Sequence, residues 1–156
     1  MKWFCLVLVM AGTVFGGGSK YENSRLLFRE AMAAGALLVA TMEKYDMEVV
    51  KVDMDLVGTK AEKQVVKYMS AGYSYLISAV GQPSRISDLD IEVYYLVPEE
   101  NGESVLVALD KKTDNTPAVT LNPTVSGTYI IKVKAASMRK GYEDTMGFYF
   151  LIVAHN

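Results

Sequence analysis

The chain has very few residues of the kinds that build most catalytic and metal sites. Among its 156 residues there is one cysteine, Cys5, and one histidine, His155. A single cysteine excludes an internal disulfide, and it leaves little material for zinc sites or for Cys-His and Ser-His-Asp arrangements. His155 also lies next to the C-terminus, where chains fray. We therefore expect no enzyme and assign no catalytic residue.

Neither sign of charge predominates in the chain. The chain carries 16 Lys and Arg against 18 Asp and Glu, a formal net charge of −2, and its basic residues are scattered. Because nucleic-acid-binding proteins carry clustered basic surfaces, nucleic acid is excluded as a partner class. Hydrophobic residues make up 51% of the chain. This composition and length are typical of one folded domain with one core.

Residues 1–16 differ from the rest of the chain. Met1-Lys2 supplies a positive charge, Trp3 to Val14 is almost wholly apolar, and Val14-Phe15-Gly16 offers small residues near a cleavage point. This layout predicts a secretory signal peptide. The apolar run is shorter than the roughly 20 residues that span a bilayer, so a membrane anchor is disfavoured. We expect a secreted or periplasmic mature chain, with no transmembrane segment and no cysteine.

The next segment, residues 17–46, is predicted to hold a linker and one helix. Asn23 or Ser24 can cap a helix that runs to about Tyr45. Apolar residues at steps of three or four form one stripe: Leu27, Ala31, Ala34, Leu38, Met42 and Tyr45. Two interpretations stay open. The apolar stretch can pack on its own domain, or residues 24–45 can form a homo-oligomer or dock on a partner.

From Met47 onward the apolar period changes to two, which predicts strands. The first places Val50, Val52, Met54 and Leu56 on one side. Further strands are predicted over 65–69, where a helical turn is the alternative, and over 73–80, 88–97, 105–109, 117–121, 127–137 and 147–154. Asn101-Gly102 favours an antiparallel hairpin between two of them. The fold class is mainly β: an antiparallel β-sandwich or jelly roll of about eight strands, preceded by one α-helix.

The run Ser87 to Pro98 shows the alternation most clearly. Its inward positions are predicted to be Leu89, Ile91, Val93, Tyr95 and Val97. On the other side, Tyr94 and Glu92 are candidate residues of a ligand surface for a protein or a glycan. Single exposed aromatic residues are common, so such a surface needs several side chains together.

Five segments, taken in order, resemble the bacterial pre-peptidase C-terminal domain, a small β-sandwich often attached to secreted proteases. They are 56–59, 70–79, 87–94, 114–119 and 126–133. The resemblance covers roughly the last hundred residues, the size of one such sandwich. It implies a secreted β-sandwich that serves in binding, targeting or folding support. The predicted division is a signal peptide (1–16), a linker and helix (17–46), and a pre-peptidase C-terminal-like sandwich (47–156).

Acidic residues at strand ends suggest that the protein can bind calcium. Calcium prefers several hard oxygen ligands and is plentiful outside cells, and relatives of the fold that the chain resembles can bind it through acidic loop residues. The candidates are Asp88, Asp90, Asp110, Asp114 and Asn115. The alternative is that these side chains cap turns through local hydrogen bonds. No cofactor is required. The expected function is an exported, non-catalytic binding or accessory module, with a structural subunit assembled through the helix as the alternative.

Overall fold

The computed structural model describes residues 19–98 and 102–156, with side chains from Arg25 onward. The predicted signal peptide, residues 1–16, lies outside the described residues. Within them the chain forms one helix and eight strands. Their bounds are α1 Ser19–Lys44, β1 Glu48–Val57, β2 Glu62–Met69, β3 Tyr75–Gly81, β4 Ile86–Leu96, β5 Ser104–Asp110, β6 Ala118–Leu121, β7 Gly127–Met138 and β8 Gly147–His155.

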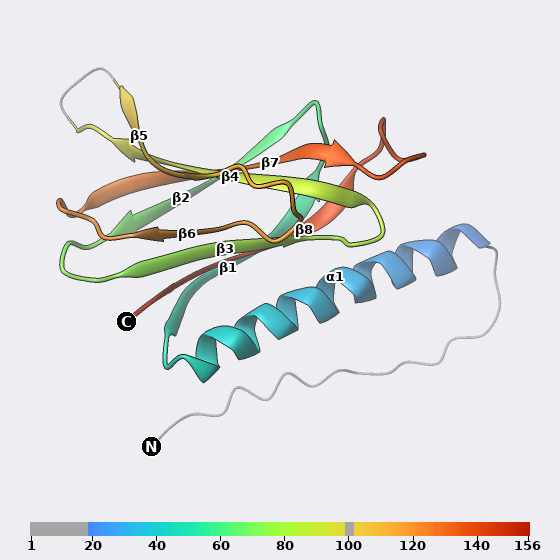
Figure 1. The fold of residues 1–156 in the computed structure, drawn as a ribbon, viewed down its shortest axis with the longest axis horizontal. Coiled ribbons are helices and arrows are strands. Elements are labelled where there is room, and N and C mark those ends of the chain that lie inside the picture. Colours follow the sequence, from blue (N-terminus) through green and yellow to red (C-terminus); the bar gives the residue numbers. More distant parts are fainter. Residues whose placement is uncertain (1–18, 99–101) are drawn as a thin grey trace.

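The strands pair in a nested antiparallel pattern: β1 with β8, β2 with β7, β3 with β6, and β4 with β5. This pairing produces two four-stranded sheets, β1-β8-β3-β6 (sheet I) and β2-β7-β4-β5 (sheet II). Consecutive strands thus alternate between sheets, except that β4 and β5 form a hairpin within sheet II, and this is the arrangement of an eight-stranded jelly roll. In Figure 1, sheet II lies above sheet I, and α1 runs beneath sheet I. The predicted fold class is confirmed, and residues 62–69 form a strand and not a helical turn.

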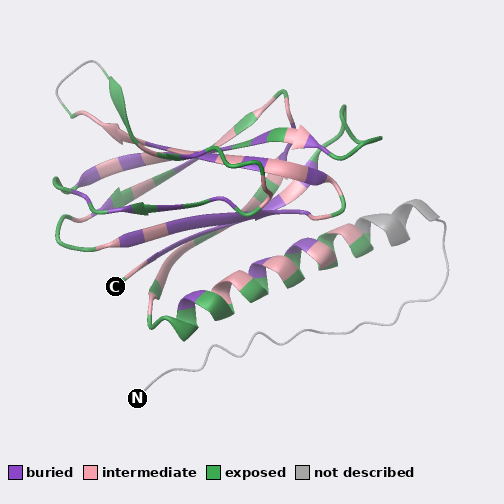
Figure 2. Ribbon diagram, viewed as in Figure 1, coloured by how far each residue is buried: buried purple, intermediate pink, exposed green. Residues whose placement is uncertain are grey.

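The main core lies between the two sheets. Alternate residues of each strand point inward, so the purple buried segments in Figure 2 follow the strands of both layers. Leu89, Ile91 and Val93 are completely buried there, as predicted, and Tyr95 packs against them. Val97 is half-buried and lies beyond the end of β4. This core consists almost entirely of aliphatic residues and tyrosines.

A second core lies between α1 and the outer face of sheet I. Met42 of the helix is buried with Phe150, Ile152 and Ala154 of β8. The helix therefore packs on its own domain, which was one of the two interpretations left open by the sequence. The boundary predicted at residue 46 stays a prediction. Among the described residues, no helix is both long enough and apolar enough to cross a membrane.

Two details of the predicted helix are wrong. The helix begins at Ser19, so Asn23 and Ser24 lie inside its first turns and not at its cap. No glycine or proline between Ser19 and Asn23 opposes this earlier start. Tyr45 was expected to continue the buried stripe, but it is largely exposed because the helix has already ended at Lys44.

The predicted single face of β1 is also wrong. A β-bulge shifts the register between Val49 and Lys51. Val50 consequently packs into the core between the sheets, whereas Met54 packs on the helix side. A bulge inserts one unpaired residue and so reverses the faces that follow it. Since both faces of sheet I are covered, the strand can place apolar residues on either side.

Candidate binding surface

The outer face of sheet II carries no covering element in the described part of the chain. α1 contacts β8, β3 and β1, all of which belong to sheet I. Figure 1 accordingly shows the β2-β7-β4-β5 layer on the side of the molecule away from the helix. Side chains that point outward from sheet II are therefore the residues of an open surface.

An apolar row crosses this face from one edge to the other. The strand register places Val66 opposite Ile130, Ile130 opposite Tyr94, and Tyr94 opposite Leu106. Their chain neighbours Val65, Ile131 and Val93 are buried in the core, so these four side chains point outward. Val66 is 63% exposed and Leu106 43%. We call Val66, Ile130, Tyr94 and Leu106 the apolar row.

A charged band lies directly beside the apolar row. It consists of Glu62, Asp90, Glu92, Lys111, Lys132 and Lys134. Lys134 of β7 lies opposite Glu62 of β2 on one side and Asp90 of β4 on the other. Since opposite charges face each other across the strands, the band is stabilised within the sheet.

Tyr94 and Glu92, the two residues predicted for a ligand surface, are brought together at the border between the row and the band. The Tyr94 hydroxyl donates to Glu92 Oε2 at 2.6 Å, and Lys111 Nζ lies 2.7 Å from Glu92 Oε1. The hydrogen bond from Lys111, followed by that from Tyr94, holds the pKa of Glu92 below its usual value. Lys132 Nζ lies 5.0 Å from the centre of the Tyr94 ring. These contacts hold the ring in one orientation.

Asp88 and Asp90 lie close together near the start of β4. Burial, and then the negative charge of Asp88, raise the pKa of Asp90. Register irregularities fall on both sides of Asp88, and its Oδ1 atom is enclosed without a hydrogen-bond partner. Two carboxylates placed in this way repel each other. A bound cation would remove that repulsion.

The other three candidate calcium ligands make turn-capping hydrogen bonds. The two carboxylate oxygens of Asp110 accept from the backbone N–H groups of Lys112 and Ala118, each at 3.0 Å. Asp114 Oδ1 accepts from the N–H of Thr116, and Asn115 Nδ2 donates to the Gly81 carbonyl. Over residues 19–98 and 102–156, no three acidic, histidine or cysteine side chains are grouped to hold a metal. The calcium hypothesis stays a prediction, and its remaining local basis is Asp88 with Asp90.

His155 is not at a frayed end, contrary to the expectation from its position. It belongs to β8 and lies opposite Glu48 of β1 and Tyr75 of β3. Its ring centre lies 4.6 Å from that of Tyr73 and 5.4 Å from that of Tyr75. The histidine is thus part of an aromatic cluster that closes one end of sheet I.

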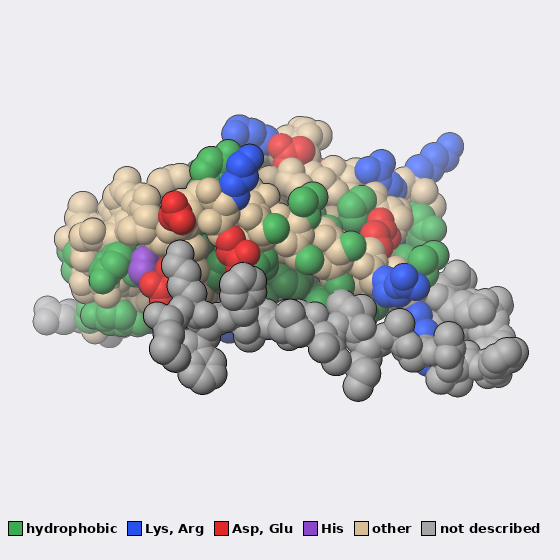
Figure 3. All heavy atoms as spheres, turned by 90° about the horizontal axis from the view of Figure 1, so that it is seen from below, with side chains coloured by type: hydrophobic (Ala, Val, Ile, Leu, Met, Phe, Trp, Pro, Cys, Tyr) green, Lys and Arg blue, Asp and Glu red, His purple; other side chains and the backbone are tan. Residues whose placement is uncertain are grey.

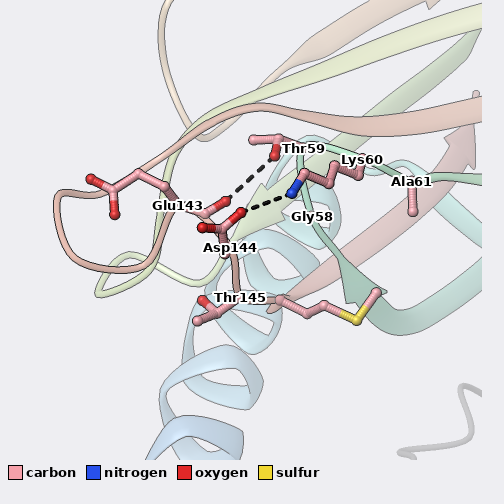
Figure 4. A pocket seen from close by; sticks show the side chains of 8 residues that line it. Gly58, Thr59, Lys60, Ala61, Glu143, Asp144 and Thr145 are labelled. Atoms are coloured by element: carbon pink, nitrogen blue, oxygen red, sulfur yellow. Dashed lines mark hydrogen bonds and ion pairs between the residues drawn. The ribbon is translucent and has the colours of Figure 1, made fainter.

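A shallow hollow of about 110 Å³ lies between the 58–61 turn and the 143–146 loop (Figure 4). An ion pair between Lys60 and Asp144, 2.8 Å long, crosses it, and both side chains are more than 80% exposed. Typical small-molecule pockets have volumes of roughly 300–1,000 Å³. This hollow is too small for such a ligand.

The sequence did not reveal the apolar row. β2 carries apolar residues on both faces, with Val65 and Met69 inward and Val66 and Tyr68 outward. Alternation alone therefore could not indicate which side of β2 faces water. Neither could it show that Ile130 and Tyr94 meet in one line, because that depends on the register between β4 and β7.

No protein-family model matches the chain, and a search of curated proteins finds no match. Solved structures with a similar arrangement include a mitogen from Yersinia pseudotuberculosis, at 11% identity and a TM-score of 0.47, covering 66% of this chain and 82% of that one. The pre-peptidase C-terminal domain of a collagenase from Bacillus anthracis aligns at 14% identity and a TM-score of 0.47, covering 66% and 87%. A periplasmic inhibitor of g-type lysozyme from Aeromonas hydrophila aligns at 16% identity and a TM-score of 0.44, covering 68% and 85%. The aligned structures thus include a pre-peptidase C-terminal domain, the family that the sequence resembles.

Proposed function

We propose that this chain is an exported, non-catalytic β-sandwich module that binds a protein partner through the outer face of sheet II. The observation that carries the proposal is the apolar row beside the charged band on an uncovered face. Protein interfaces combine an apolar centre that loses water with a polar rim that sets orientation. Val66, Ile130, Tyr94 and Leu106 supply the centre, and Lys132 with Glu92 supplies part of the rim.

The shape of the face favours a protein over a small molecule or a glycan. The described residues of sheet II form an extended surface, and the hollow at Lys60 and Asp144 belongs to a different part of the molecule. A glycan platform needs neighbouring aromatic rings. Tyr68 and Tyr94 lie on β2 and β4, with β7 between them. A partner surface of matching apolar and charged stripes fits this face better.

Export is proposed from the layout of residues 1–16. A short positive start, an apolar run and small residues near Gly16 are the three parts of a secretory signal. N-terminal sequencing of the chain recovered from the periplasm or medium of a bacterial host is expected to begin at Gly17. Recovery of the chain from the cytoplasm with an intact N-terminus would contradict export. That result would not bear on the binding surface.

The rival function is a structural subunit assembled through α1. The buried side of the helix is already occupied by sheet I, so assembly would have to use its outer side, where Leu37 is 72% exposed. Figure 3 shows the molecule from below, and its green hydrophobic side chains lie among blue and red charged ones. The outer face of sheet II is preferred because its apolar side chains form one continuous row across four strands.

A photo-crosslinking residue placed at Val66 tests the proposal against the same residue placed at Leu37. Both positions are exposed, one on the apolar row and one on α1. The variants are incubated with secreted and periplasmic proteins of the producing cells, and a discrete adduct is expected from position 66 alone. Equal adducts from both positions, or none from position 66, would contradict the proposal.

The captured protein is then purified and its affinity measured directly. Val66→Lys is expected to weaken binding at least about tenfold, the size of effect typical of a residue near an interface centre. Leu37→Lys is the control and is expected to leave the affinity unchanged. An affinity that responds to Leu37→Lys and not to Val66→Lys would assign the binding surface to the helix.

A further inference from the structure

Strand β5 presents a weakly protected edge. It is the last strand in the order β2-β7-β4-β5, so one row of its backbone N–H and C=O groups has no strand beside it. Its four large apolar side chains are each between 41% and 53% exposed; they are Val105, Leu106, Val107 and Leu109. Its one charged residue, Asp110, is buried, with both carboxylate oxygens occupied by backbone N–H groups. The only protective feature of this kind on β5 is a bulge at Val107, and no exposed charge on the strand repels an added strand.

The other three edges of the sandwich are protected. β6 has only four residues, and Pro117 and Pro123 stand on either side of it. β1 carries several charged residues and a bulge near Val50. β2 is tied to β1, because Lys63 Nζ lies 2.6 Å from Asp55 Oδ2 and Lys67 Nζ donates to the Val50 carbonyl. Charges, prolines, bulges and short length are the usual ways in which proteins prevent edge pairing.

We propose that β5 pairs antiparallel with β5 of a second copy of this chain, which makes a two-fold dimer. The charge flanking the strand selects this occupant and this direction. Glu103 precedes the strand, and Lys111 and Lys112 follow it. In an antiparallel pair, the acidic flank of one copy meets the basic flank of the other at both ends. In a parallel pair, each flank would meet its like.

The dimer joins two copies of sheet II into one continuous eight-stranded sheet. Leu106 is the end of the apolar row, so pairing at β5 brings the two rows together. The bulge at Val107, which places both Leu106 and Val107 opposite Tyr94, divides β5 into two short ladders. Each ladder gains backbone hydrogen bonds, and exposed apolar side chains of both strands leave water. Leu106 belongs to both surfaces, but the dimer is inferred from the edge of β5 and does not rest on partner binding by the face of sheet II.

Sedimentation of the chain purified from its producing cells, across a wide range of concentrations, measures the dimer directly. A concentration-dependent dimer is expected, because association follows mass action. Val105→Lys adds a charge to the β5 edge and is expected to leave a monomer. Val66→Lys is the matched control, since Val66 is also an exposed valine but lies on the opposite edge strand of sheet II, and it is expected to remain dimeric. Circular dichroism melts show whether each variant is folded.

Charge reversal tests the direction of pairing. Glu103→Lys alone makes both flanks basic and is expected to weaken the dimer at least about tenfold, and Lys112→Glu alone is expected to do the same by making both flanks acidic. Lys112 is chosen because Lys111 already pairs with Glu92. The double variant Glu103→Lys with Lys112→Glu is expected to restore the dimer. Restoration is a result that a merely structural effect of either substitution would not produce.

Three results would overturn the inference. A chain that stays monomeric at all concentrations has no β5 dimer, and a dimer broken by Val66→Lys but not by Val105→Lys uses the sheet face instead. If the charge reversals leave the affinity of the dimer unchanged, the acidic flank of one copy does not contact the basic flank of the other. Partner binding that depends on Val66 can survive any of these results, so failure of the dimer and failure of the proposed function are distinguishable.

Discussion

The carboxylate of Glu30 in α1 accepts a hydrogen bond from Nε2 of Gln82, a side chain in the β3–β4 turn that is 1% exposed, at 3.2 Å. The same carboxylate accepts from the backbone N–H of Ser84 at 2.8 Å and from its hydroxyl at 2.5 Å. Gln82 also accepts from the N–H of Phe148 through Oε1. One glutamate therefore joins the helix, the β3–β4 turn and the start of β8.

Glu30→Ala is expected to lower the free energy of unfolding by about 1–3 kcal/mol, because it leaves the buried amide of Gln82 with fewer partners. The control is Glu43→Ala on the same helix. Glu43 is exposed and makes no side-chain hydrogen bond among the described residues, so a change within about 0.5 kcal/mol is expected there. Urea unfolding of both variants measures the difference. Equal effects of the two substitutions would show that the Glu30 contacts contribute nothing specific.

Gly35 provides a test in which two effects have opposite signs. Replacing a helical glycine by alanine normally stabilises a helix by about 1 kcal/mol. At Gly35, however, the new Cβ would lie 2.5 Å from ring carbons of Phe150, and overpacking of this kind costs about 1–3 kcal/mol. Gly35→Ala is therefore expected to destabilise the protein in thermal and urea unfolding. A stabilised variant would mean that α1 is free to move away from sheet I.

A double-mutant cycle with Phe150→Leu identifies the cause of that effect. Phe150→Leu removes the ring and is destabilising by itself, since it leaves a space in the second core. In that background, Gly35→Ala is expected to be neutral or stabilising, because the methyl group enters the vacated space. An unchanged penalty for Gly35→Ala in both backgrounds would assign the cost to the helix backbone and not to the ring.

The positions of the strands along the chain were predictable from the sequence because each strand carries local signals. Alternation, turn residues and the Asn-Gly pair act over a few positions, and all eight predicted strands are present. The contacts of α1 were less accessible. Leu27 to Met42 predicted a buried stripe, but the hydrogen bonds that Glu30 accepts from Gln82 and Ser84 join residues more than fifty positions apart. No local pattern contains that information.

Only part of the candidate site was predictable, because local patterns do not show which strands lie side by side. Tyr94 and Glu92 are two positions apart on one strand, so alternation alone places them on one face. Val66 and Leu106 join that face only through the registers of β2 with β7 and of β4 with β5. Asp110 was a calcium candidate from its residue type. Only the three-dimensional structure shows that backbone N–H groups occupy both of its oxygens.

Asp110 predicts an acid-sensitive contribution to stability. Burial raises the pKa of its carboxyl group, but hydrogen bonds from the N–H groups of Ala118 and Lys112 outweigh that effect, and the pKa is lowered overall. A carboxyl group with a lowered pKa in the fold stabilises it above the unfolded value of about 3.9, and this stabilisation is lost as the pH falls through the folded pKa. Asp110→Asn is therefore expected to lower the melting temperature at neutral pH.

The difference between wild type and Asp110→Asn is expected to shrink in melts recorded below about pH 4, and to be lost as the pH falls through the lowered pKa of the folded wild-type carboxyl group. Asp144→Asn is the control. The pKa of Asp144 is lowered by its hydrogen bond with Lys60, but both side chains are almost fully exposed, and solvent screens the pair. Its melting temperature is expected to match wild type at both pH values. A constant deficit of Asp110→Asn at every pH would point to a packing effect.

The close pair Asp88 and Asp90 predicts stability changes of the opposite sign. Burial and the charge of Asp88 raise the pKa of Asp90, so the charged form costs stability as the pH rises from the unfolded value through the folded pKa. Asp90→Asn is therefore expected to raise the melting temperature at neutral pH in the presence of chelator. Asp114→Asn is the control, because its Oδ1 caps the turn at Thr116, and it is expected to give no increase.

The same pair decides the calcium hypothesis. If calcium binds between the two carboxylates, millimolar calcium raises the melting temperature of the wild type relative to chelator, because a ligand that binds only the folded state stabilises it. Asp88→Asn and Asp90→Asn should each reduce that rise, whereas Asp114→Asn should keep it. No rise in the wild type removes the hypothesis, because a ligand that binds only the folded state must stabilise it. A rise that survives both substitutions would place calcium at a different site.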